Sequence, residues 1–330
     1  MSETPKTPSQ TEVQKDEIII RTEKLAKYFG KDVAVRKVTM EIPRGKIFGF
    51  IGPSGCGKTT TIRMLTGYYT PSEGRVEVLG HTPTDFTRRL KERIGYMPQL
   101  FVLYPHLSVW ENLNFAASIY GMQLSRRERM EAVLDFVELN EHRDKLARNI
   151  SGGMQRRLSL AATLVHNPDL IFLDEPTAGI DPMLRQRFWE HFRELQKENR
   201  TFFITTQYVG EAAYCDLVGI MDEGELLTVD TPKGLRYRAY GGDIVDICTA
   251  EPLTYKMESS FCELPFVRGE VLRTGEQNVR VIVDEASTAI PDLMEWCQNQ
   301  QCVIESMEEY LPPFEEVFVQ IIQAEEESHA

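Results

Sequence analysis

The sequence predicts an α/β fold, in which a largely parallel sheet is covered by helices on both faces, followed by a small α+β module. Short apolar segments such as 47–51 and 170–174 are typical of buried strands. Amphipathic segments such as 183–199 lie between these strands, as expected of helices that cross over a parallel sheet. The charge then changes, because residues 241–330 hold 19 acidic and 4 basic residues, whereas the whole chain has a net charge of −13. We therefore predict a core over residues 17–240 and an acidic module over residues 241–330.

The composition argues against several classes of protein. No apolar run approaches the roughly 20 residues that a membrane-spanning helix needs. Residues 1–16 are mostly Ser, Thr, Gln, Glu, Lys and Pro, which predicts a disordered tail rather than a signal peptide. The six cysteines show no metal-ligand spacing, so we expect thiols in a reducing, cytosolic compartment. The acidic balance argues against nucleic acid as a partner.

A phosphate-binding loop follows the apolar strand at 47–51. The loop reads Gly52-Pro53-Ser54-Gly55-Cys56-Gly57-Lys58-Thr59 and matches the pattern G-x-x-x-x-G-K-[ST] at every fixed position. Glycines let the backbone fold closely around phosphates, Lys58 supplies a mobile cation, and the Thr59 hydroxyl suits Mg²⁺. A helix that begins near Thr60 would point its positive end at the same anion. The sequence therefore predicts a phosphate site at this loop.

A second stretch, residues 150–182, supplies two further parts of a site. Ser151-Gly152-Gly153 precedes an amphipathic run, which is typical of a helix start whose free N–H groups bind an anion. An apolar segment then ends in Asp174 and Glu175, so a buried strand would present two carboxylates at its tip. Asp174 could hold a metal ion, and Glu175 could act on water as a general base.

Four further residues are candidates. Gln99 and Gln207 each follow a predicted strand, at the point where the chain leaves the core. An amide in that place can ligate Mg²⁺ or hold a water, although a single Gln is by default a surface residue. Tyr28 and Phe29 lie upstream of the phosphate loop and could stack on a purine, but they fit a hairpin core equally well.

The remaining elements are expected as follows. Strands are predicted at 17–21 and 33–42 with a turn at 27–31 between them, and an edge strand is predicted at 75–80. Helical patterns fill residues from about 100 to 165, which predicts a helical insertion. The acidic module reads as strand, helix, two strands, helix, strand, helix, which is compatible with a ferredoxin-like α+β fold.

These motifs, in this order, resemble the nucleotide-binding subunit of an ABC transporter, which has a P-loop NTPase core. The resemblance covers about residues 17–240. It rests on the phosphate loop Gly52–Thr59, the Q-loop Gln99, the signature Ile150–Met154, the Walker B strand Leu170–Glu175, the D-loop Ala178–Asp181 and the switch position Gln207. Segments 75–80, 104–109 and 312–318 are similar to the ABC-2 exporter branch, which includes drug-resistance and sodium-efflux ATPases.

The resemblance implies an ATPase that pairs head to tail with a second nucleotide-binding subunit around two molecules of ATP. Each ATP would lie between Lys58 and Thr59 of one subunit and Ser151 and Gly153 of the other. Closing of this dimer would drive a separate ABC-2-type transmembrane permease, at the cytoplasmic face of the membrane. The resemblance also implies adenine stacking on Phe29 with Tyr28 second, Mg²⁺ ligation by Thr59, Gln99 and Asp174, a general base at Glu175, and a nucleotide contact from Asp181.

Two residues depart from the family pattern. Met154 replaces the usual Gln at the end of the signature, and we expect a small effect because backbone groups bind most of the phosphate. Gln207 stands where the family usually has His, which puts the switch residue in question. Two other readings remain: a soluble ABC ATPase acting on ribosomes or DNA, and the ATPase of an importer. A single phosphate loop without a heptad run disfavours the former, and the closing Glu-Glu-Val-Phe segment disfavours the latter.

Overall fold

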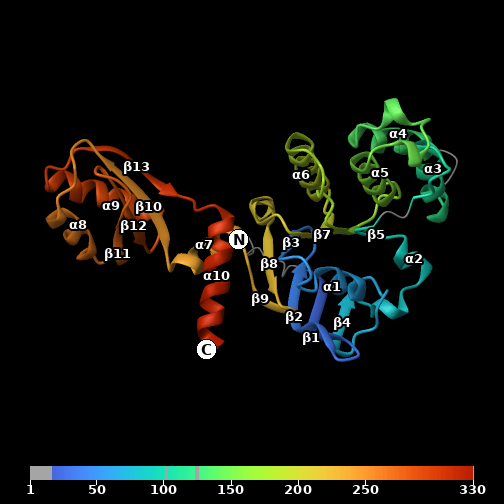
Figure 1. Ribbon diagram of the computed structural model, residues 1–330, viewed down its shortest axis with the longest axis horizontal. Helices are drawn as coiled ribbons and strands as arrows, with labels where there is room; N and C mark the ends of the chain where they lie inside the picture. Colours follow the sequence, from blue (N-terminus) through green and yellow to red (C-terminus); the bar gives the residue numbers. More distant parts are fainter. Residues whose placement is uncertain (1–16, 101–102, 123–125, 330) are drawn as a thin grey trace, which may run out of the picture.

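The computed structural model describes residues 17–100, 103–122 and 126–329, and the predicted tail 1–16 lies outside them (Figure 1). A large sheet with its helices occupies one side of the molecule, and a smaller sheet occupies the other. Two helices, α7 (Pro232–Tyr240) and α10 (Phe314–His329), lie between the two sheets. None of the described helices is long and apolar enough to cross a membrane.

Within the described residues, the larger sheet has nine strands in the order β4-β1-β2-β9-β8-β3-β7-β6-β5. In that order the strands are Glu73–Val78, Ile18–Phe29, Asp32–Pro43, Glu225–Asp230, Leu217–Asp222, Ile47–Ile51, Thr201–Thr206, Leu170–Asp174 and Ile94–Met97. The predicted parallel pairing is confirmed for β8, β3, β7, β6 and β5. The N-terminal strands pair antiparallel: β1 pairs with both β2 and β4, and the turn predicted after the first strand joins β1 to β2 as a hairpin.

The antiparallel pairing of β1 and β2 has a local cause. The turn predicted at 27–31 is shorter than expected, since Phe29 pairs with Asp32 and leaves Gly30 and Lys31 alone in the turn. Gly30 has a φ of 63°, the left-handed conformation that such tight turns require. A turn of two residues can join only antiparallel strands. Because the turn is this short, both strands run longer than predicted.

The buried strands of the large sheet carry apolar side chains on both faces. In β7, Phe202 and Ile204 contact the apolar cluster under α5 (Gly152–Leu164) and α6 (Pro182–Lys197). Phe203, between them, points to the opposite cluster under α1 (Lys58–Leu65). Side chains alternate along a strand, so a strand that is apolar at every position must be buried on both faces.

The predicted helical insertion is present. After the short α2 (Arg88–Lys91) and β5, the chain forms α3 (Val109–Ile119), α4 (Arg127–Phe136) and α5. Ser108 and Glu111 form a capping box at the start of α3, in which each side chain accepts a hydrogen bond from the other residue's backbone N–H. These helices make a separate helical lobe beside β5 (Figure 1).

The acidic module has its own sheet and its own core. Its strands are β10 (Asp243–Thr249), β11 (Val267–Arg273), β12 (Asn278–Val283) and β13 (Ile304–Tyr310), and its helices are α8 (Tyr255–Cys262) and α9 (Ala286–Asn299). The strands pair antiparallel in the order β11-β12-β10-β13. This element order agrees with the ferredoxin-like prediction.

One part of the predicted division at residue 241 is wrong, because α10 belongs to the core of the large sheet. Phe314, Val317 and Ile321 are almost fully buried in the cluster that also contains Ala212 and Leu235. The Arg236 guanidinium also lies 4.0 Å from the centre of the Phe314 ring. Acidic residues of α10 lie on its solvent-facing side. They obscure, in the sequence, the apolar stripe that packs against the large domain.

Replacing a buried residue of α10 should therefore destabilise the large domain. Ile321→Ala is expected to lower the free energy of unfolding by about 2–5 kcal/mol, because it opens a cavity in the core. Val319→Ala is the matched control, since Val319 is 49% exposed on the same helix, and should cost less than about 0.5 kcal/mol. Urea unfolding followed by tryptophan fluorescence measures both, and equal stabilities would contradict the packing of α10.

Candidate functional site

The candidate residues meet at the carboxyl edge of the parallel strands. The register pairs the last residue of β3 with Thr206, and Asp174 with Thr205. Because parallel strands end at the same edge, the phosphate loop after β3, the carboxylates at the end of β6 and Gln207 after β7 are neighbours. Strand β5 ends two residues before Gln99 and pairs with β6, which brings Gln99 to this edge.

The phosphate loop is folded so tightly that two positions accept only glycine. A Cβ atom on Gly52 would lie 2.0 Å from the carbonyl oxygen of Met221. A Cβ atom on Gly57 would lie 2.4 Å from the carbonyl oxygen of Ala34, and the φ of Gly57 is 107°. The loop passes directly into α1, whose first N–H groups lack partners within the helix and suit an anion.

The ammonium group of Lys58 lies inside this loop. It donates hydrogen bonds to the carbonyl oxygens of Gly52 at 2.8 Å and Pro53 at 2.7 Å, and Lys58 is only 4% exposed. Burial raises the pKa of the neighbouring Cys56 thiol, so this thiol stays neutral and adds no charge to the loop. The loop therefore concentrates one positive charge where a phosphate would lie.

Asp174 provides a buried oxygen that suits a cation. Its Oδ1 accepts hydrogen bonds from the hydroxyls of Thr205 at 2.6 Å and Thr59 at 3.1 Å. Its Oδ2 is buried and has no hydrogen-bond partner among the described residues. A buried carboxylate oxygen without a donor is costly unless a ligand pairs with it. An oxygen-rich pair of Asp174 and Thr59 beside a phosphate loop fits Mg²⁺.

Glu175 has an unusual backbone. Its φ is 51°, in the left-handed region that a side chain other than glycine rarely adopts. Its N–H donates to the hydroxyl and to the carbonyl oxygen of Thr205, each at 3.1 Å, and Glu175 is 8% exposed. Such strain costs roughly 1–3 kcal/mol and is found mostly at functional sites.

The signature residues lie away from the phosphate loop of the same chain. Ser151 begins α5, and its hydroxyl accepts a hydrogen bond from the N–H of Met154 at 3.3 Å. Ser151 and Gly152 are exposed and belong to the helical lobe, apart from α1 in Figure 1. Gly153 adjoins the D-loop, since a Cβ on Gly153 would lie 3.5 Å from the carbonyl oxygen of Gly179.

Asp181, the last D-loop residue, is exposed and starts α6. Its Oδ1 accepts a hydrogen bond from the N–H of Leu184 at 3.0 Å, which is an N-cap. Gln99 and Gln207 are exposed as well. Both amides are therefore free to turn towards a ligand at the edge of the sheet.

The two aromatic candidates differ in their surroundings. Phe29 is 43% exposed, and its ring meets the edge of Tyr69 at a centroid distance of 5.3 Å. Tyr28 is half-buried. Because neighbouring side chains alternate along a strand, Tyr28 and Phe29 point to opposite faces. An exposed ring face is what base stacking needs, so the surroundings favour Phe29 over Tyr28.

Two residues of this region escaped the sequence analysis. Thr205 was visible only as part of a polar strand tip, yet it contacts both Asp174 and the backbone of Glu175. Arg156 was hidden in the amphipathic run after the signature, where a basic residue is expected to face solvent. It is in fact 8% exposed and contacts the carbonyl groups of residues 174–176.

Comparison with known proteins agrees with this geometry. Residues 35–178 match the model of a family described as ABC transporter. The chain is 36% identical over 221 residues to the probable multidrug ABC transporter ATP-binding protein YbhF of Escherichia coli, covering 67% of this chain and 38% of that protein. It is 35% identical over 231 residues to the linearmycin resistance ATP-binding protein LnrL of Bacillus subtilis, covering 69% of this chain and 74% of that protein. A solved dimeric bacterial ABC transporter cassette superposes with a TM-score of 0.60 at 26% identity, over 64% of this chain and 98% of that chain.

The chain thus spans well under half of the E. coli relative but about three quarters of the B. subtilis one. The family model extends from β2 to Ala178 and includes the phosphate loop, the signature and both carboxylates. On these grounds the chain belongs to the ABC transporter family of ATP-binding proteins.

Proposed function

We propose that this protein binds and hydrolyses Mg²⁺–ATP and thereby powers a separate membrane subunit of an ABC exporter. The observation that carries the proposal is the buried carboxylate of Asp174, whose Oδ1 accepts a hydrogen bond from Thr59 at the end of the phosphate loop and whose Oδ2 has no partner among the described residues. Two relatives support the exporter part of the proposal: one is named as a probable multidrug ABC transporter ATP-binding protein, and the other as a linearmycin resistance ATP-binding protein.

In this proposal the phosphate loop binds the β- and γ-phosphates through backbone N–H groups and Lys58. Thr59, Asp174 and Gln99 are the residues that would hold Mg²⁺, and the ion would neutralise charge on the phosphates. No group of three or more His, Cys, Asp or Glu residues that could hold a metal occurs among the described residues. Phosphate oxygens would therefore complete the coordination.

Glu175 is the proposed general base. It follows Asp174 at the tip of β6, and its strained backbone fixes the direction of its side chain. A carboxylate in this place can accept a proton from the water that attacks the γ-phosphate. Gln207, at the end of the adjacent strand, would orient the same water or donate to a phosphate oxygen.

The proposal requires a second nucleotide-binding subunit. Ser151 is exposed and Gly153 is half-buried on the helical lobe, away from the phosphate loop of their own chain. A head-to-tail pair would place them over the nucleotide of the partner, with Asp181 close by. The dimeric cassette that superposes on this chain supports such a pair.

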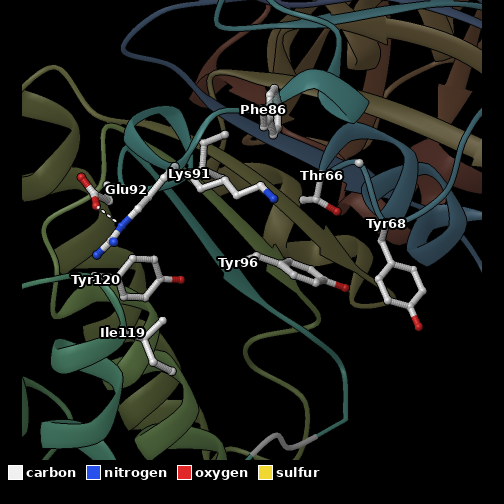
Figure 2. A pocket seen from close by; sticks show the side chains of 11 residues that line it. Thr66, Tyr68, Phe86, Lys91, Glu92, Tyr96, Ile119 and Tyr120 are labelled. Atoms are coloured by element: carbon white, nitrogen blue, oxygen red, sulfur yellow. Dashed lines mark hydrogen bonds and ion pairs between the residues drawn. The ribbon is translucent and has the colours of Figure 1, made fainter.

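The membrane partner has a candidate docking site in a cavity of about 610 Å³ between the core and the helical lobe (Figure 2). Tyr68 and Thr66 line it from the end of α1, Tyr96 lines it from β5, and Ile119 and Tyr120 line it from the end of α3. An occupant would therefore touch both lobes and the strand that leads to Gln99. We infer that the occupant is a cytoplasmic segment of an ABC-2-type permease.

The rim of this cavity indicates the chemistry of that segment. Arg88 and Lys91 are exposed at its edge, and Arg88 pairs with Glu92 at 3.2 Å. Basic groups around an aromatic floor favour a segment with apolar and acidic side chains. Docking there would hold the protein at the cytoplasmic face of the membrane.

Docking can be tested by photo-crosslinking in native membranes. Benzoylphenylalanine at Ile119, which is 58% exposed, should crosslink to an integral membrane protein with several spans. The same group at Tyr255, which is 83% exposed on the acidic module, is the matched control and should give no such product. Equal products from both positions, or none from Ile119, would contradict docking at the cavity.

Glu175→Gln should trap a dimer. The amide keeps the shape of the side chain but cannot act as a base, so ATP binds and is not hydrolysed. Size-exclusion chromatography with Mg²⁺–ATP should show a dimer that the unmodified protein forms only weakly. Adding Lys58→Ala to this variant should abolish that dimer. A monomer under all these conditions would count against the head-to-tail pair.

Gln207 should act as a weaker substitute for the usual histidine. Loss of one preorganised donor typically slows a reaction by about 10²–10³-fold, so Gln207→Ala should reduce single-turnover hydrolysis strongly at unchanged ATP affinity. Gln207→His should match or exceed the unmodified rate and add an ionisation near pH ~6.5. A Gln207→Ala variant that runs at the unmodified rate would remove the switch role.

A further inference from the structure

Arg156 makes an unusual set of contacts for a residue one turn into a helix. Its guanidinium donates to the carbonyl oxygen of Gln99 at 3.2 Å, of Asp174 at 3.1 Å and of Pro176 at 3.4 Å. It also donates to the carbonyl oxygen of Glu175. All four acceptors are backbone groups, and they belong to the two segments that carry the candidate Mg²⁺ ligands and the candidate base.

The choice of arginine has a physical reason. Burying a charged side chain is unfavourable unless its hydrogen bonds are satisfied. A planar guanidinium offers five donors in a fixed fork, which suits several carbonyl groups around one point. An ammonium group on a flexible stem could reach fewer of them in the same geometry.

These contacts fix the strained backbone of Glu175 from both sides. On one side, Thr205 accepts hydrogen bonds from the N–H of Glu175. On the other side, Arg156 holds the carbonyl oxygens of Asp174 and Glu175. Both peptide groups next to the Glu175 Cα atom are therefore held, and so is the direction in which its side chain leaves the chain.

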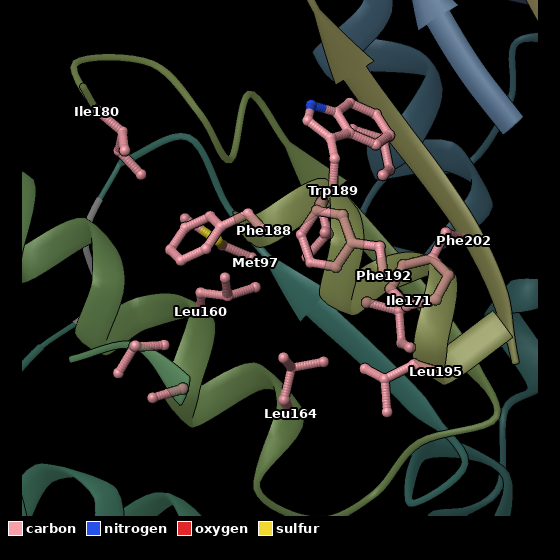
Figure 3. Packing of buried hydrophobic residues seen from close by; sticks show 14 of the residues in the cluster. Met97, Leu160, Leu164, Ile171, Ile180, Phe188, Trp189, Phe192, Leu195 and Phe202 are labelled. Carbon is pink, nitrogen blue, oxygen red and sulfur yellow. The ribbon is translucent and has the colours of Figure 1, made fainter. Parts of the chain in front are cut away.

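The helix that carries Arg156 is itself held firmly on the sheet (Figure 3). Leu160 and Leu164 of α5 belong to the same buried cluster as Met97 of β5 and Ile171 of β6. The two strands that lead to Gln99 and Asp174 are thus packed under the helix that begins at Ser151.

From this geometry we propose that Arg156 is a positioning residue for hydrolysis, which holds the backbone of Glu175, and with it the Glu175 side chain, in the working place. The inference rests on the proposed ATPase function. Among the described residues, the Arg156 side chain donates no hydrogen bond to the phosphate loop or to Ser151, so it should affect the rate of the chemical step more than nucleotide binding.

The test compares Arg156→Gln with Arg157→Gln. Arg157 is the next residue of the same helix and also donates to backbone carbonyl groups, those of Val137 and Glu138, outside the site. Arg156→Gln should lower kcat by at least about tenfold, because a misplaced base loses much of its effect, and should leave the KM for ATP within about twofold. Arg157→Gln should keep kcat within about twofold.

A double variant separates positioning from general stability. If Arg156 acts through Glu175, then Arg156→Gln should change the residual rate of Glu175→Gln by less than about twofold. Additive losses in the double variant would overturn the proposal. So would an Arg156→Gln protein that retains the unmodified kcat.

Arg156→Lys covers the case in which Arg156→Gln does not fold. This variant keeps the positive charge but loses the planar guanidinium with its five donors. It should lower kcat by at least about fivefold at unchanged KM. An unmodified rate in this variant would overturn the proposal. If the unmodified protein hydrolyses no ATP with Mg²⁺, the proposed function fails; if it does, a normal Arg156→Lys refutes only the role of Arg156.

Discussion

The parallel pairing of β3 with β7, and of β7 with β6, is the constraint on which the site depends. It sets Asp174 opposite Thr205 and starts the phosphate loop beside them. A slip of one residue would turn every side chain of a strand to the other face of the sheet. Phe202 and Phe203 are packed in different clusters on opposite faces, so both clusters resist such a slip. The hydrophobic effect therefore determines the distances between the polar groups of the site.

The burial of the site in this core reduces the stability of the nucleotide-free protein. Lys58, Asp174 and Glu175 are all less than 9% exposed. Lys58 and Glu175 are held mainly by backbone and hydroxyl groups, and one oxygen of Asp174 has no partner among the described residues. Groups that are buried, charged and incompletely paired reduce stability. A nucleotide with Mg²⁺ would supply the missing interactions, which is the energetic reason to place the ligand here.

Much of this could be predicted from the sequence, because the motifs are local. The loop at Gly52–Thr59 and the acids at the end of β6 depend on short segments whose conformation their own residues determine. Arg156 could not be predicted, since its acceptors are carbonyl groups that every sequence contains. The packing of α10 could not be predicted either, since its acidic residues resemble those of the module before it. The turn between β1 and β2 was predicted, but its length was not, since it has two residues instead of five.

The most direct test of the whole account is phosphate release from ATP by the purified protein, measured with and without Mg²⁺, beside Lys58→Ala. The account predicts hydrolysis by the unmodified protein that requires Mg²⁺ and is lost in the variant, because a water-excluded phosphate site loses its mobile cation. Hydrolysis that persists in Lys58→Ala, or that proceeds equally well without Mg²⁺, would contradict it.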